Sequence, residues 1–265
     1  MASRTIDTAN LGRFIGDSAA ALVRAAPTCE VRQSPGATLA LSGEPVADLN
    51  YITLDASHDP GARLREFAAI IHARQLPVLV LLSAAVADVV APVAQDLGLT
   101  HAGGMPLMTH DGHGVPDALG TGTGTIAVTR VVSVADLVAA LSIMAQANAL
   151  PEDAVQRTMG SGFLDALGVD VFLARQGDRP LSAVITTRHG ATVGIWCMAT
   201  LPASQRAGAG RALLTQVMAQ HRASGAHLFY LGATEAGYPL YERMGFRTVE
   251  TLPIWVAGHS TQVPG

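Results

Sequence analysis

The sequence is poor in charge. Only 14% of its 265 residues are charged, and the formal net charge is -4. This balance gives no electrostatic reason to expect nucleic acid or an anionic membrane as a partner. Because 49% of the residues are apolar, the chain has enough material for a large core, and a disordered chain is excluded.

Cysteines and long apolar runs are equally scarce. The two cysteines, Cys29 and Cys197, lie far apart in extended-looking segments, and buried free thiols are favoured over one disulfide. No uncharged apolar stretch reaches the roughly 20 residues of a membrane-spanning helix, since residues 76–94 are interrupted by one aspartate and two prolines. Residues 1–7 show no apolar signal core, so the expected location is the cytoplasm.

Glycine is abundant, and one glycine-rich stretch organises the second half of the chain. An extended run over residues 195–200 leads into residues 205–211, and an amphipathic helical pattern follows. A helix N-terminus offers unpaired N–H groups, the turn glycines allow close approach of a ligand, and two arginines add positive charge. The pattern predicts a phosphate-type anion site. For the glycines alone, an ordinary loop before a helix explains the pattern equally well.

Two motifs favour the anion site. Gln205-x-x-Gly208-x-Gly210 resembles the acyl-CoA pyrophosphate signature of the GNAT superfamily of N-acetyltransferases. Tyr241-Glu242-Arg243-Met244-Gly245-Phe246 resembles the second signature of the same family, at the right distance. The resemblance covers roughly residues 125–257, about half of the chain.

An internal repeat extends this resemblance to the first half. Both halves read as meander, helix, strand, helix and strand. At an offset of 147, residues 53–62 face residues 200–209, and six of these ten positions are identical. We therefore expect a duplication and an α+β fold of two GNAT-like domains, each a mostly antiparallel twisted sheet flanked by helices. The predicted boundaries are 1–108 for the first domain, 109–124 for a linker and 125–265 for the catalytic domain.

The differences between the two copies indicate which one binds a phosphate group at this turn. Asp59 stands in place of Arg206 and would repel a phosphate. Pro60 stands in place of Ala207 and has no N–H to offer. Arg63 stands where the second copy has Gly210. The first copy is therefore predicted to be a folded but degenerate domain.

The resemblance also implies site residues. In the family, two splayed parallel strands hold the pantetheine arm of acetyl-CoA, and here these are residues 191–200 and 227–231. Backbone groups near Met198 and Thr200 would pair with the pantetheine amides, and the Met198 N–H would polarise the thioester carbonyl. The pyrophosphate would be held by residues that follow Gln205 in the turn and first helical turn, namely Arg206, Ala207, Gly208, Ala209, Gly210 and Arg211.

Tyr241 matches the general acid of the family, which protonates the departing CoA thiolate. A phenol with a pKa of about 10 keeps its proton at neutral pH and suits that role. The alternative is a core tyrosine that packs at helical spacing. Tyr238, one turn away, is the backup, and Thr234 stands where the family often places a CoA-contacting asparagine.

Other chemistry stays open. The general base is not identifiable, and Glu235, Glu242 and His227 are candidates by position only. Cys197 would permit an acyl-cysteine route, but the family transfers directly. Metal binding at His110, Asp111 and His113 is disfavoured because no further ligands stand at metal spacing.

The predicted function is N-acetyl transfer from acetyl-CoA to an amine of a small molecule or peptide, by a monomer or homodimer without a metal. The alternative is a non-catalytic acyl-CoA sensor or partner-binding protein. A nucleotide-binding oxidoreductase is disfavoured, because an antiparallel meander precedes the glycine turn where a Rossmann unit needs a parallel strand and crossover.

Overall fold

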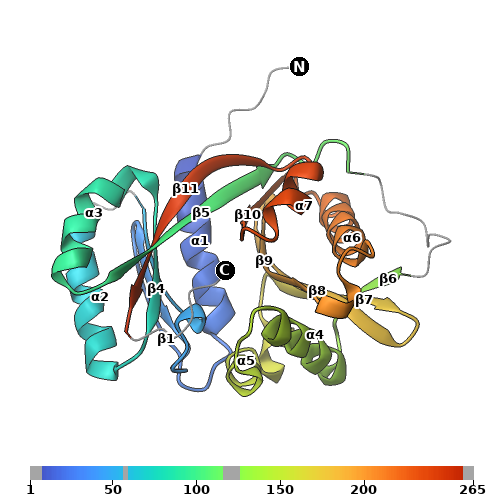
Figure 1. Ribbon diagram of the computed structural model, residues 1–265, viewed down its shortest axis with the longest axis horizontal. Coiled ribbons are helices and arrows are strands. Elements are labelled where there is room, and N and C mark those ends of the chain that lie inside the picture. The colour runs from blue at the N-terminus through green and yellow to red at the C-terminus, as the bar shows by residue number, and fades with distance from the viewer. Residues whose placement is uncertain (1–7, 56–58, 116–125, 259–265) are drawn as a thin grey trace. The chain divides into compact units, whose positions relative to one another are not determined.

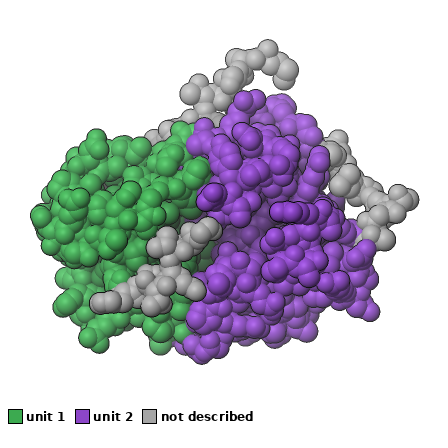
Figure 2. All heavy atoms as spheres, in the orientation of Figure 1, with its two compact units in different colours: residues 1–24, 28–106, 249–263 green, residues 25–27, 107–248, 264–265 purple. Residues whose placement is uncertain are grey.

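The computed structural model describes residues 8–55, 59–115 and 126–258, which form two compact units (Figures 1 and 2). Unit 1 holds the described residues of 1–24, 28–106 and 249–263, and unit 2 holds those of 25–27 and 107–248. Each unit is a mostly antiparallel sheet with helices against it, which confirms the predicted α+β class. Among the described residues, no helix combines the length and apolar character needed to cross a bilayer.

Unit 1 has one helix on one face of its sheet and two on the other (Figure 1). The strands lie in the order β1-β2-β3-β4-β11-β5. The β1–β2, β2–β3 and β4–β11 pairs are antiparallel, and the β3–β4 pair is parallel. In chain order the elements are α1 (Thr8–Val23), β1 (Glu30–Ser34), β2 (Ala37–Leu41), η1 (Ala47–Leu49), β3 (Asn50–Leu54), α2 (Pro60–Arg74), β4 (Val78–Leu82), α3 (Ala84–Asp96), β5 (Thr100–His110) and, from the chain's end, β11 (Arg247–Ala257).

The core of unit 1 follows the two-residue period of its strands. Alternate residues of β2 and β3 pack against α2 and α3, among them the fully buried Leu39, Ile52 and Leu64. Residues on the other face, such as Ala40 and Tyr51, form a smaller cluster with Ala19 and Val23 of α1. One face of the sheet therefore carries most of the apolar burial.

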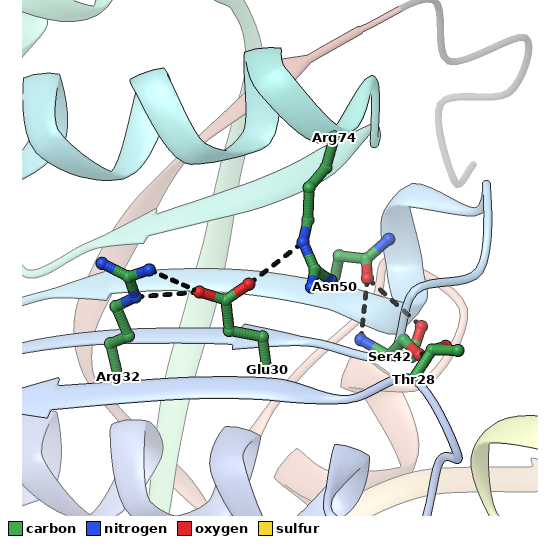
Figure 3. Close-up of polar contacts among 6 residues, drawn as sticks. All are labelled: Thr28, Glu30, Arg32, Ser42, Asn50 and Arg74. Atoms are coloured by element: carbon green, nitrogen blue, oxygen red, sulfur yellow. Dashed lines mark hydrogen bonds and ion pairs between the residues drawn. The ribbon is translucent and has the colours of Figure 1, made fainter.

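A buried asparagine fixes the start of β3 (Figure 3). Asn50 is fully buried, and its Oδ1 accepts hydrogen bonds from the backbone N and the hydroxyl of Ser42, at 2.9 and 3.2 Å. Its Nδ2 donates to the carbonyl oxygens of Glu44, Val46 and Pro77 at 2.8–3.0 Å. A buried polar side chain stabilises only when its partners are complete, and this one joins three segments of unit 1.

We expect Asn50→Ala to lower the free energy of unfolding by about 3–5 kcal/mol, because it leaves several buried polar groups unpaired. This corresponds to an unfolding midpoint lower by about 10 °C, measurable by differential scanning calorimetry. Asn148→Ala is the control, since the Asn148 side chain donates to the Met144 carbonyl in the last turn of its own helix and, among the described residues, makes no other hydrogen bond. Equal effects of the two substitutions would show that the Asn50 network does not hold unit 1 together.

Unit 2 has the strand order β5-β10-β9-β8-β7-β6, in which only the β9–β10 pair is parallel. α4 packs against β8 and β9, while α6 contributes to the apolar core on the sheet. Its elements are β6 (Ile126–Arg130), α4 (Val134–Ala147), α5 (Glu152–Thr158), η2 (Ser161–Asp165), β7 (Val169–Gln176), β8 (Arg179–His189), β9 (Thr192–Thr200), η3 (Pro202–Ser204), α6 (Ala209–Ala223), β10 (Leu228–Gly232) and α7 (Tyr238–Arg243).

Helix boundaries agree with their local signals, with one exception. The spacing Ser133-x-x-Asp136 predicts a helix cap, and α4 begins there, with the Ser133 hydroxyl accepting from the Asp136 N–H at 3.1 Å. Pro151 predicts the start of a second helix to about Leu167, but α5 ends at Thr158 and is followed by the short η2. Gly160 and Gly162 lie at this break, and glycine disfavours the helix interior.

Each unit contains a strand from the other half of the sequence. β11, from the second half, lies antiparallel to β4 in unit 1, with Trp255 opposite Val80. Glu250 of β11 also accepts a hydrogen bond from the Ala84 N–H at the start of α3. The end of β5, from the first half, pairs with β10 in unit 2, with Met108 opposite Leu231. Neither unit is therefore built from one continuous half of the chain.

Candidate functional site

Two parallel strands of unit 2 separate at one end. β10 pairs with β9 from Leu228–Thr192 to Leu231–Ile195, and β10 ends one residue later. β9 continues for five more residues, to Thr200. Its backbone groups beyond Ile195 thus have no partners on β10, which is the splayed arrangement predicted for this strand pair.

A bulge reshapes β9 within this separated part. Ala183 of β8 faces Ala199, and Ile185 faces Trp196, so that Val184 faces both Cys197 and Met198. Cys197 has a φ of 49°, in the left-handed region. A bulge leaves the extra residue out of the ladder and turns backbone groups in a new direction. The Met198 backbone therefore lies where the regular ladder of β9 is interrupted.

The glycine-rich turn after β9 has alternating backbone handedness. Arg206 and Gly208 have φ values of 61° and 82°, in the left-handed region, and Gly208 is followed directly by Ala209, the first residue of the right-handed helix α6. Successive residues of alternating handedness aim their N–H groups into a concavity that binds anions. α6 starts directly behind Gly208, and no side chain caps its N-terminus. The turn thus combines a nest, that is, a concave group of backbone N–H donors, with a helix N-terminus that no side chain caps.

The polar groups around the turn are consistent with an anion there. Arg206 and Arg211 are exposed, and neither makes an ion pair with a carboxylate among the described residues. The hydroxyl of Ser204 is buried and has no hydrogen-bond partner within the described part of the chain. The Gln205 amide donates to the Thr200 carbonyl at 3.4 Å and ties the turn to the end of β9. These residues fit the pyrophosphate of a CoA thioester.

Gly210 has a packing role that the sequence did not reveal. It is buried, and a Cβ there would lie 3.1 Å from the Thr200 hydroxyl, 3.2 Å from Met198 Cε and 3.6 Å from Leu240. Its missing side chain lets α6 approach β9 and α7 closely. At Gly208, by contrast, a Cβ would meet nothing within 4 Å, and the left-handed backbone is what favours glycine.

Tyr241 is 8% exposed and lies in the core of unit 2 beside the separated strands. Its ring packs edge-on against Phe246 at 6.0 Å between centroids and closely against Gly237. Burial raises the pKa of its hydroxyl to about 12. Among the described residues that hydroxyl has no hydrogen-bond partner. A proton donor without a protein partner is therefore available at this place.

The two neighbouring candidates are engaged elsewhere. The Thr234 hydroxyl accepts from the Gly237 N–H at 3.2 Å, just before α7. The Tyr238 hydroxyl lies 3.2 Å from that of Thr248 at the start of β11. The Thr234 and Tyr238 side chains are thus committed to local structure.

None of the three predicted general-base candidates is buried in the structure. Glu235, Glu242 and His227 are all exposed to solvent. His110 is buried at the end of β5, where burial lowers its pKa, and its Nδ1 accepts from the Gly112 N–H at 2.8 Å. The described residues contain no group of three or more metal-ligating side chains.

A cluster that sequence reasoning missed lies where the strands begin to separate. A Cβ at Gly194 would come within 2.6–2.7 Å of the Trp196 Nε1, the Tyr230 hydroxyl and the Thr187 hydroxyl. Trp196 donates to Thr187 at 3.0 Å, and its ring meets Tyr230 edge-on. The only signal in the sequence is the two-residue period, which places Gly194 and Trp196 on the face opposite Val193 and Ile195.

The matching region of unit 1 is closed. β3 pairs with β4 up to the last residue of both strands, Leu54 opposite Leu82, so these strands do not separate. The Asp59 side chain accepts from the Ala62 N–H at 2.8 Å and caps α2. The chain's own carboxylate thus occupies the helix N-terminus that an anion would need. Both features agree with the predicted degeneracy of the first copy.

The comparisons with known proteins bear on unit 2 first. Residues 168–248 match the sequence model described as acetyltransferase (GNAT) domain. This range contains both predicted signatures, β9, β10 and Tyr241. No curated protein matches the sequence.

Solved structures extend the similarity to nearly the whole chain. A GCN5-related N-acetyltransferase from Kribbella flavida superposes with a TM-score of 0.66 at 18% identity, covering 97% of this chain and 98% of that one. A tandem GNAT protein from the clavulanic acid biosynthesis pathway gives 0.57 at 11% identity, covering 98% and 90%. A GCN5-related N-acetyltransferase from Sphaerobacter thermophilus gives 0.60 at 12%, covering 87% and 80%. At these identities the similarity establishes the fold, including the tandem arrangement.

Proposed function

We propose that this acetyltransferase, which carries a GNAT domain at residues 168–248, transfers an acetyl group from acetyl-CoA directly to an amine of a small molecule or peptide. The observation that carries the proposal is the separated end of β9, which lies next to the uncapped N-terminus of α6. An extended backbone with free hydrogen-bonding groups suits a pantetheine arm, and the nest beside it suits a pyrophosphate.

Different groups of the protein bind the pyrophosphate, align the pantetheine arm and assist the chemical step. N–H groups of residues 206–211 hold the pyrophosphate, and the β9 backbone near Thr200 aligns the pantetheine. The Met198 N–H, at the bulge, donates to the thioester carbonyl and stabilises the negative charge that develops there. The amine nitrogen bonds to the carbonyl carbon as the carbon–sulfur bond breaks, and Tyr241 donates its proton to the departing sulfur. The proton that the amine loses passes to water, which returns one to Tyr241. Acetyl-CoA supplies the activated acyl group.

A non-catalytic acyl-CoA-binding protein is the second candidate, favoured by the exposure to solvent of the three general-base candidates, Glu235, Glu242 and His227. Two measurements on the same protein distinguish these functions. Calorimetry measures acetyl-CoA binding, and a thiol assay measures the release of CoA with a broad panel of amines. Turnover with any amine supports the enzyme. Tight binding without turnover across the panel supports the binding protein.

We further propose that only the second copy binds acyl-CoA, with residues 1–108 and 125–265 as the duplicated domains and 109–124 as their connection. The closed β3–β4 pair and the cap by Asp59 support this assignment. Calorimetry should then give one acetyl-CoA per chain.

Gly208→Val should weaken acetyl-CoA binding by about tenfold or more, because a β-branched residue resists the left-handed backbone on which the nest depends. Gly177→Val is the matched control. Gly177 also has a positive φ, 57°, and open space around its Cα, but it lies in the β7–β8 turn. If both variants bind acetyl-CoA as the parent does, the nest is not the pyrophosphate site.

A further inference from the structure

Unit 1 contains a cavity of about 440 Å³ between α1 and the sheet face opposite its main core. Its floor comes from β2 and β3, and its rim from the β1–β2 turn and the residues that follow β3. Ligand pockets commonly measure about 300–1,000 Å³, so this cavity has room for a molecule of amino-acid size. One lining residue, Thr53, corresponds to Thr200 of the predicted acyl-CoA site at the repeat offset of 147, whereas residues 59–64, the counterparts of residues 206–211, are not among the lining residues.

The floor of the cavity carries hydroxyl groups without partners. Thr38 and Thr53 face each other across β2 and β3, and each is only 6% exposed. Within the described residues, neither hydroxyl has a hydrogen-bond partner. The Ser34 hydroxyl, on the same lining, is buried and also lacks one. Because buried hydroxyls are normally paired, the enclosed Ser34 hydroxyl and the two unpaired threonine hydroxyls on the same cavity point to a polar ligand.

Charges of both signs surround these hydroxyls. Arg13 stacks on Phe14 at the rim, and among the described residues it makes no hydrogen bond or ion pair. Asp17 and Asp55 supply carboxylates on the same lining. The Gln33 amide holds Asp17 in place with a hydrogen bond of 2.9 Å. A guanidinium recognises a carboxylate, and carboxylates recognise an ammonium group.

Two glycines of α1 set the cavity walls. A Cβ on Gly12 would lie 2.6 Å from Asp55 Cβ, and one on Gly16 would lie 2.6 Å from the Thr38 hydroxyl and 2.9 Å from that of Thr53. The helix therefore rests on polar side chains through its glycine face. Most helix–sheet contacts bury apolar surface instead, so this polar interface suggests selection for something other than packing.

We propose that this cavity binds a small zwitterion, an amino acid or a molecule with the same pair of groups. Arg13 receives the carboxylate at the rim, Asp55 and Asp17 receive the ammonium group, and the threonine hydroxyls complete the hydrogen bonds on the floor. The site is separate from the proposed acyl-CoA site, so the first copy has a ligand of its own.

Calorimetry on the full-length protein, with the twenty standard amino acids as probes, tests the proposal. At least one should bind, with one molecule per chain. Its decarboxylated amine and its deaminated acid should each bind about tenfold more weakly, because each loses one charge-assisted interaction. If no amino acid binds at about 10 mM, or if the amine or the acid alone binds equally well, the proposal is wrong.

Two variants locate the bound amino acid. Arg13→Gln and Thr53→Val should each weaken binding by about tenfold, whereas Arg63→Gln, on the surface of α2, should change it less than about twofold. Because Arg13 is exposed, the Arg13→Gln variant is expected to fold. It therefore tests the site even if the Thr53→Val variant does not fold. Binding that survives Arg13→Gln overturns the assignment.

Discussion

Tyr241→Phe is expected to lower kcat for acetyl transfer by about a hundredfold while leaving the affinity for acetyl-CoA within about twofold. The substitution removes only the hydroxyl, and the ring contacts with Phe246 and Gly237 persist. Steady-state kinetics with a reactive amine, together with calorimetry, measures both quantities.

Tyr238→Phe is the matched control, because its hydroxyl lies against Thr248 and should change kcat less than about twofold. The pH profile adds a second readout. Because the pKa of Tyr241 is raised to about 12, its proton stays in place through the range in which an ordinary tyrosine loses it. The rate should therefore show no descending limb below about pH 10. Equal losses in the two variants would contradict the role of Tyr241.

Cutting the chain at residue 118 is expected to leave neither fragment folded. Residues 119–265 lose β5, whose end pairs with β10 and whose Met108 is fully buried in the core of unit 2. Residues 1–118 lose β11, which covers the edge of β4 and places Trp255 in the core of unit 1. Unpaired strand edges and exposed core surface lead to aggregation. Circular dichroism and size-exclusion chromatography should show no cooperative unfolding transition for either fragment.

Co-expression of the two fragments provides the control. The exchanged strands predict that the fragments assemble together and recover acetyl-CoA binding. A fragment of residues 119–265 that is monomeric, cooperatively folded and active on its own would contradict this account.

Local chemistry made much of the architecture predictable. The apolar spacing of Leu64, Phe67 and Ile71 after Pro60 predicts a helix over 60–74, and α2 has the bounds Pro60–Arg74, because Asp59 caps it and proline suits its first turn. The repeat made the tandem arrangement predictable, since both copies keep the same order of elements and six identical residues at the turn. The positive φ of Gly208 is likewise a consequence of a turn that only glycine adopts easily.

Features set by tertiary structure could not be predicted. β5 pairs with β10 of unit 2, and β11 pairs with β4 of unit 1, so each strand lies beside a strand from the other half of the sequence. No local sequence pattern specifies these partners. The role of Gly210 depends on side chains from β9 and α7 that meet only after folding. The cluster around Gly194 brings together residues from three strands. Sequence alone therefore located the turn but not the neighbours that shape the site.

The most direct test of the central claim is a crystal structure of the protein with acetyl-CoA bound. The account predicts one molecule per chain, with its pyrophosphate against the N–H groups of residues 206–211 and its thioester near Met198 and Tyr241. Acetyl-CoA bound at the N-terminus of α2, or in both units, would contradict the assignment of a single working site.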